Sequence, residues 1–105
     1  MQRKDIEIYS EERDNSIVRM PGRRYLGSVM QGDSLFLLHA EAMDILESLK
    51  YNPGNEMFYA AYSIAKNLED RLTHYIRVCN ENDVELGLRI ESSVEDYADL
   101  IDSGL

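Results

Sequence analysis

The spacing of hydrophobic residues changes at Gly32, from the two-residue period of strands to the 3.6-residue period of helices. Three short segments before this residue carry strand signals, and two long segments after it repeat apolar residues three and four positions apart. The 105 residues are enough for one compact domain and too few for two of ordinary size. We therefore expect residues 1–105 to form a single domain of the α+β class.

Three strands are expected before the change of period. Residues 5–9 alternate isoleucine with more polar side chains, residues 16–20 follow a polar turn, and residues 25–31 form the third segment. Pro21 and Gly22 favour a type II turn, because proline presets the first φ angle and glycine accepts the positive second one. Strands joined by such short turns predict an antiparallel meander.

Two long helices are expected after the strands. The first begins at Gly32, and we expect the side chain of Asp33 or Ser34 to cap its first turn. The second runs to about Asn80, and the short loop over residues 52–55 predicts an antiparallel hairpin. The expected apolar stripes are Leu35, Leu38, Ala42, Ile45, Leu46 and Leu49 on the first helix, and Met57, Phe58, Ala61, Ile64, Ala65, Leu68, Leu72, Tyr75, Ile76 and Cys79 on the second.

The chain after the second helix returns to a period of two. Residues 84–90 alternate apolar and polar side chains, which indicates a fourth strand as an open alternative. Ser92 and Glu95 have the spacing of a capping box, so we expect a short last helix that stops near Gly104. The predicted fold is a three-stranded antiparallel meander packed on an antiparallel helix hairpin, with a short C-terminal helix.

The turn and the start of the first helix carry a recognisable pattern. Residues 18–25 read V-R-M-P-G-R-R-Y, followed by Gly27 and by Q-G-D-S-L over residues 31–35. This resembles a family of small bacterial proteins of unknown function, whose shared pattern is close to V-x-L-P-G-R-x-aromatic-x-G-x-x-x-Q-G-D-S-L. The resemblance supports the α+β fold and implies no activity and no catalytic residues.

The resemblance extends over most of the chain, from about residue 5 to residue 88. A weaker second stretch, residues 71–86, is similar to the closing helix of that family and the short segment after it. The sequence departs from the pattern at Leu26, where a proline is common, and at residues 82–83, where a His-Gly pair is common.

Charge restricts the kinds of partner. Eleven basic and twenty acidic residues give a formal net charge of −9, so DNA and RNA are not expected as partners. Residues 81–105 hold eight acidic side chains and one basic side chain, Arg89. The sequence has no membrane-length apolar run, and its single cysteine, Cys79, fits a reducing compartment. We therefore expect a cytoplasmic protein.

An anion site is the sharpest local hypothesis. Phosphate or carboxylate would be held by basic side chains and by the N–H groups that open the first helix. The carboxylate of Asp33 would compete for those N–H groups, so a plain turn and a plain helix cap are the alternative interpretation. The residues of this candidate site are Arg19, Arg23, Arg24, Gly32, Asp33 and Ser34.

The sequence offers little for catalysis. His39 and His74 have no Cys or His at ligand spacing, and Cys79 falls on the apolar stripe. No nucleophile motif or glycine-rich phosphate loop is present. We therefore expect no catalytic residues, no metal and no cofactor.

Two arguments favour an interaction protein. A helix of about 25 residues spans roughly 38 Å, whereas a seven-residue strand spans about 23 Å, so the sheet leaves part of the hairpin uncovered. The C-terminal segment or a second copy could cover the rest. Tyr59 and Tyr62 are candidate interface residues, since tyrosine is enriched at interfaces. We expect a small acidic, non-catalytic interaction module that forms a homodimer; the alternatives are an immunity or inhibitor protein that binds a basic partner, and a small anion- or ligand-binding regulator.

Overall fold

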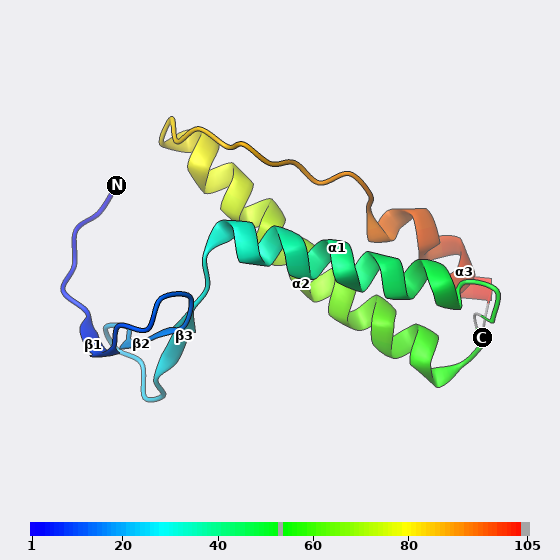
Figure 1. Cartoon of the computed structure of the whole chain (residues 1–105), viewed down its shortest axis with the longest axis horizontal. Coiled ribbons are helices and arrows are strands. Elements are labelled where there is room, and N and C mark those ends of the chain that lie inside the picture. Colours follow the sequence, from blue (N-terminus) through cyan, green and yellow to red (C-terminus); the bar gives the residue numbers. More distant parts are fainter. Residues whose placement is uncertain (53, 104–105) are drawn as a thin grey trace.

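A computed structural model describes residues 1–52 and 54–103 and shows an α+β architecture (Figure 1). A three-stranded sheet is followed by two long helices, an extended segment and two short helical pieces. These elements are β1 (Glu7–Ser10), β2 (Ser16–Arg19), β3 (Gly27–Val29), α1 (Gly32–Leu49), α2 (Glu56–Glu81), the 3₁₀ turn η1 (Val94–Tyr97) and α3 (Ala98–Ser103). The α+β class, the three strands, the two long helices and the short C-terminal helix are confirmed.

The sheet is the expected antiparallel meander, with strand order β1-β2-β3. Gly22 has a φ of +77°, and the N–H of Arg23 donates to the carbonyl of Met20 at 3.1 Å. Both features fit the type II turn predicted at Pro21-Gly22.

The two faces of the sheet differ in polarity. Ile8 lies opposite Val18, and β3 continues the same face with Val29, which lies opposite Ser16. Cross-strand partners share a face of the sheet, so these three apolar side chains lie together. The other face carries the charged pair Glu7 and Arg19, which lie opposite each other, and also Ile17, which lies opposite Ser28.

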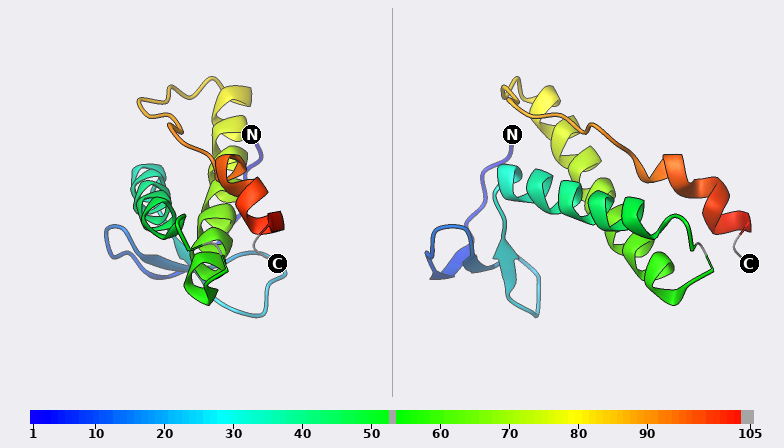
Figure 2. Two further views of the ribbon diagram at one scale, coloured as in Figure 1. Left: turned by 90° about the vertical axis from the view of Figure 1, so that its right-hand side faces the viewer. Right: turned by 45° about the vertical axis from the view of Figure 1, so that its right-hand side comes forward.

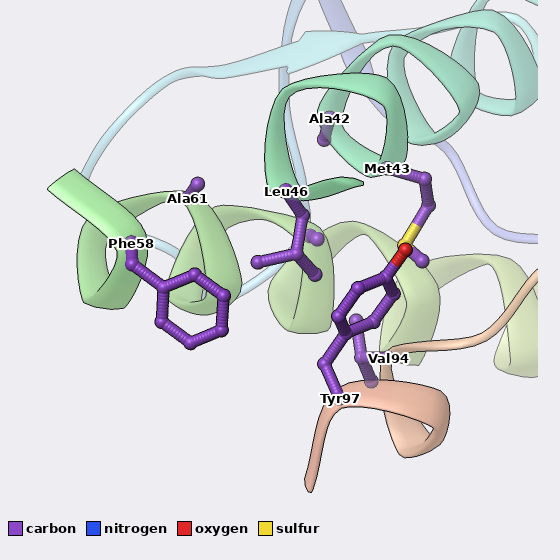
Figure 3. Close-up of a cluster of buried hydrophobic side chains, with 8 residues drawn as sticks. Ala42, Met43, Leu46, Phe58, Ala61, Val94 and Tyr97 are labelled. Carbon is purple, nitrogen blue, oxygen red and sulfur yellow. The ribbon is translucent and has the colours of Figure 1, made fainter. Parts of the chain in front are cut away.

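The two long helices form the antiparallel hairpin, and α2 begins with a side-chain cap. The N–H of Met57 donates to Oδ1 of Asn55 at 2.7 Å. Figure 3 shows where the two helices meet the C-terminal segment. The core cluster there consists of Ala42, Met43, Leu46, Phe58, Ala61, Ala65, Val94 and Tyr97.

The buried face of the hairpin differs in part from the predicted stripes. His39 and Met43 are buried, whereas Ile45, Met57 and Ile64 are exposed. The reason is the position of the C-terminal segment, which packs beside Met43 on one side of the hairpin and leaves the opposite side open.

The sheet does not pack on the hairpin, contrary to our prediction. Among the described residues, strands make extensive contacts only with strands, and helices only with helices. The link from Val29 to Gly32 is two residues long, and α1 leads away from the sheet (Figure 1). The sheet therefore lies beyond the N-terminal end of α1.

Residues 84–90 do not form a fourth strand, which corrects the prediction made from their alternation. They are extended without a neighbouring strand, and they return along the hairpin towards its loop end (Figure 2). An extended chain has the same two-residue period as a strand, but only a strand has a partner for its backbone. Leu86 and Ile90 are half-buried in this segment, whereas Val84 and Leu88 are exposed.

The last helical region begins one residue later than predicted. The capping box joins Ser93 and Asp96, not Ser92 and Glu95. The predicted end near Gly104 lies outside the described residues. None of the helices in the described ranges is long and apolar enough to cross a bilayer.

Candidate functional site

A polar cluster joins the hairpin to the C-terminal segment. The carboxylate of Glu69, on α2, lies 2.9 Å from Nε2 of His39 on α1, a side chain that is only 3% exposed. The Ser93 hydroxyl donates to the same carboxylate at 2.8 Å, and the N–H of Val94 donates at 3.1 Å. A single carboxylate therefore fixes three segments that are far apart in the sequence.

The cluster contains a serine, a histidine and an acid, yet its order differs from that of a catalytic triad. In a triad, the histidine lies between the serine and the acid and takes the serine proton. Here Glu69 lies between His39 and Ser93, and both side chains contact its carboxylate. The geometry is that of an anchor for the segment that leads into η1.

An open groove lies beside this anchor, between α1 and the extended segment. Its volume is about 680 Å³, and His39 lies in its wall. The charged side chains along it are Asp33, Asp44, Arg89 and Glu91, so acids outnumber bases. This balance disfavours an anionic ligand in the groove.

The basic residues of the candidate anion site do not converge. Arg19 forms an ion pair with Glu7 at 3.4 Å between Nε and Oε2, and donates to the Tyr9 hydroxyl at 2.9 Å. Arg23 and Arg24 lie in the β2–β3 turn, and α1 begins after the other end of β3 (Figure 1). The three arginines and the helix start are therefore not brought together in one site.

The start of α1 also differs from the expected cap. The N-cap residue is Gln31, and its side chain makes no capping hydrogen bond. Asp33 lies in the first turn, where its Oδ1 accepts from the N–H of Ser34 at 2.8 Å. A carboxylate in the first turn is favoured by the helix dipole, and here it occupies a donor that an anion would need.

The two candidate interface tyrosines are both half-buried. Tyr62 packs against the core cluster. Tyr59 meets the ring of Phe58 edge-on at 6.1 Å between ring centres, and its hydroxyl is shielded with no hydrogen-bond partner among the described residues. Both tyrosine side chains are less exposed than a side chain on the solvent-facing side of a helix.

Sequence reasoning missed a second link between the hairpin and η1. The buried Tyr97 donates a hydrogen bond to Glu47, and Nζ of Lys50 lies 2.5 Å from the other oxygen of that carboxylate. Burial, and then the bond to Glu47, raises the pKa of Tyr97 to about 12. Hydrogen bonds from Lys50 and then from Tyr97 lower the pKa of Glu47. The capping-box spacing near Ser93 was the only sequence signal close to this contact.

An acidic segment, residues 81–99, runs along the outside of the hairpin (Figure 1). All seven of its acids are exposed, and its only base is Arg89. Near the end of α2, Arg77 forms a long ion pair of 4.0 Å with the first of these acids. The acids are Glu81, Asp83, Glu85, Glu91, Glu95, Asp96 and Asp99.

Comparison with known proteins identifies a family. A protein-family model described as a family of unknown function matches residues 1–87. The match covers the sheet and the hairpin, and η1 and α3 lie beyond it. No curated protein and no solved structure matches the chain.

Proposed function

The chain belongs to this family of unknown function, DUF6959, and we propose that it is a small non-catalytic protein-interaction module whose acidic segment, residues 81–99, binds a basic partner. The observation that carries the proposal is the exposure of seven carboxylates beside a single arginine along this segment. An inhibitor of a basic protein is the most specific form of this function.

The charge of the segment suits recognition of a protein. Residues 81–105 contribute −7 of the formal net charge of −9. Exposed carboxylates of one sign steer a basic partner to the surface and raise its association rate. The same field repels the phosphates of nucleic acid.

The path of the segment also suits this role. Residues 84–90 are extended and have no neighbouring strand, and the Glu69 anchor ties the segment back to the hairpin at Ser93 and Val94. Anchored chain keeps its carboxylates in fixed positions, which lowers the entropy cost of binding.

Capture from native lysate, with charge variants of equal net charge, tests the proposal. One variant combines Glu85→Gln, Glu91→Gln and Glu95→Gln in the acidic segment. The control combines Asp14→Asn, Glu41→Gln and Glu56→Gln at exposed positions in the β1–β2 turn, on α1 and on α2. Each variant removes three negative charges, so any difference between them reports the position of the charge.

We expect the wild type and the control to retain the same basic protein, and the segment variant to lose it. Raising the salt from about 0.05 M to 0.5 M should release the partner, because salt screens exposed charges. Retention of the same partner by the segment variant, or capture that salt does not weaken, would contradict the proposal.

A further inference from the structure

The described fold exposes more surface than a single chain of its size normally does. Its accessible surface is 8302 Å² for 12.1 kDa, whereas a monomeric protein of that mass exposes about 6,000 Å². Its radius of gyration is 16.6 Å, against about 13 Å for a compact domain of this length. The excess, about 2,300 Å² per chain, is surface that a compact protein would bury.

Part of the excess is the apolar face of the sheet. Ile8 is 55% exposed and Val29 is 47% exposed, whereas Val18, which lies between them on the same face, is only 5% exposed. A sheet of three short strands depends for its stability on a hydrophobic face or on packing against a helix. Within the described residues, no helix of the same chain makes extensive contact with the sheet.

Another part is the open side of the helix hairpin. Ile45 on α1 is 54% exposed and Ile64 on α2 is 58% exposed. Together with Met57 and the small residues Ala60 and Ala61, they line a hollow of about 210 Å³. The C-terminal segment packs on the other side of the hairpin and leaves this hollow open.

The sheet cannot reach the hollow of its own chain. Ile45 lies 13 residues after Gly32, which places it about 20 Å along α1. Only residues 30–31 connect the sheet to α1. This short link does not prevent the sheet of one copy from reaching the hollow of a second copy.

We propose that two copies exchange these surfaces: the apolar face of β1–β3 of each copy packs into the hairpin hollow of the other. Even half of the excess surface would bury about 2,300 Å² over two chains, which is within the range of obligate homodimers. The exchange is reciprocal and closes with two-fold symmetry. It uses surfaces separate from the acidic segment and does not depend on the proposed function.

Charge favours the exchange over a contact between two hairpins. Residues 1–32 carry a net charge of +1, and residues 33–80 carry −3. The exchange places the nearly neutral sheet on an acidic hairpin, whereas a hairpin-to-hairpin contact places like charges together.

The first test is the mass of the purified full chain in solution, measured by sedimentation equilibrium from about 1 to 100 µM. We expect a mass of about 24 kDa, which is twice 12.1 kDa. A mass of one chain across this range would overturn the proposal, even if the chain binds another protein.

Charge insertions then locate the contact. Val29→Glu in the sheet and Ile45→Glu in the hairpin should each halve the mass. The matched controls are Ser28→Glu, on the other face of β3, and Leu37→Glu, at a 60% exposed position on the groove side of α1. Both controls should remain dimeric, and circular dichroism checks that every variant keeps its helices.

Mixing separates the exchange from other dimers. A Val29→Glu chain keeps its hairpin and an Ile45→Glu chain keeps its sheet, so the mixture should recover dimer through one contact. A dimer of two hairpins would tolerate Val29→Glu and would show no recovery, and either result would overturn the exchange.

Cross-linking tests the same contact independently, in chains that still form dimers. In a Cys79→Ser background, a Val29→Cys chain and an Ala60→Cys chain should form a mixed disulfide when oxidised glutathione is added as the oxidant. Ser28→Cys in place of Val29→Cys should cross-link at least five-fold less. Equal yields from Ser28 and Val29 would contradict the proposed face.

Discussion

Gly32, the first residue of α1, lies against the side chain of Tyr75 on α2, with no room for a β-carbon between them. A β-carbon at Gly32 would overlap the hydroxyl and the ring of Tyr75. The glycine therefore sets how closely the start of α1 approaches α2. This contact gives the glycine of the Q-G-D-S-L run a packing role.

We expect Gly32→Ala to lower the free energy of unfolding by about 1–3 kcal/mol, the usual cost of overpacking. Alanine is preferred to glycine in a helix interior by about 1 kcal/mol, which is an upper limit for the first residue of α1. In a Tyr75→Ala background, where the ring is absent, Gly32→Ala should therefore be neutral or stabilising. Urea denaturation of the four proteins measures this coupling. Equal effects of Gly32→Ala in both backgrounds would contradict the packing role.

A second prediction concerns the anchor that the Glu69 carboxylate forms with His39, Ser93 and Val94. Glu69→Gln keeps the size of the side chain but turns an NH₂ group towards donors such as Ser93 or His39. We expect a loss of about 2–3 kcal/mol in the free energy of unfolding, because a buried polar group then lacks its partner. Hydrogen exchange should also become faster at the backbone N–H of Val94.

The adjacent residue provides the control for this prediction. Asp70 is exposed and pairs with Lys66 at 3.7 Å. Asp70→Asn should change stability by no more than about 0.5 kcal/mol and should leave exchange at Val94 unchanged. Similar effects of Glu69→Gln and Asp70→Asn would argue against an anchor at Glu69.

Local features of the fold could be predicted from the sequence. The turn at Pro21-Gly22 and the hairpin loop are encoded by residues that are neighbours in the chain. The alternation over residues 84–90 was misleading, because it reports an extended backbone and carries no information about a neighbouring strand. The position of the sheet relative to the helix hairpin could not be predicted either, since packing between elements depends on contacts between residues far apart in the sequence.

The same limit applies to the candidate sites. His39 is buried, although it belongs to neither of the apolar stripes expected from the sequence. Its contact with Glu69 joins residues 30 positions apart, so it depends on how α1 crosses α2. Exposure of Ile45 could not be predicted either, because that required knowing which side of the hairpin the C-terminal segment covers.

We expect the raised pKa of Tyr97 to make the free energy of unfolding depend on pH in alkaline solution. Its pKa is about 12 in the folded chain and about 10 in an unfolded chain. Between these values the unfolded state has lost the proton and the folded state keeps it. The contribution of Tyr97 to the free energy of unfolding is therefore complete below pH 10. It decreases by about 1.4 kcal/mol per pH unit as the pH rises towards 12.

Urea denaturation at several pH values above 9 measures this slope, and Tyr97→Phe is the control. Phenylalanine has no proton to lose, so the variant should be less stable at pH 8 and should have a smaller slope above pH 10. Tyrosinate absorbance should show one late-titrating tyrosine in the wild type that the variant lacks. Identical slopes would show that Tyr97 is not the responsible group.

Asp83 follows the end of α2 in a left-handed conformation, with a φ of +56°. The N–H of Val84 donates to the carbonyl of Cys79 at 2.8 Å, and the N–H of Asp83 donates to that of Asn80 at 3.4 Å. This pair of bonds is the Schellman motif, in which glycine is the usual left-handed residue. Asp83 is therefore a non-glycine residue at a position that favours glycine.

We expect Asp83→Gly to raise the free energy of unfolding by about 0.5–1 kcal/mol, because relief of the left-handed strain exceeds the entropy that glycine adds to the unfolded chain. Asp83→Val should lower it by at least about 1 kcal/mol, since a β-branched residue fits this conformation poorly. Removal of a carboxylate near a helix C-terminus is itself favourable, so Asp83→Asn isolates the charge effect. Denaturation midpoints at pH 7 rank the four proteins. If Asp83→Asn gains as much as Asp83→Gly, charge explains the gain and backbone strain does not.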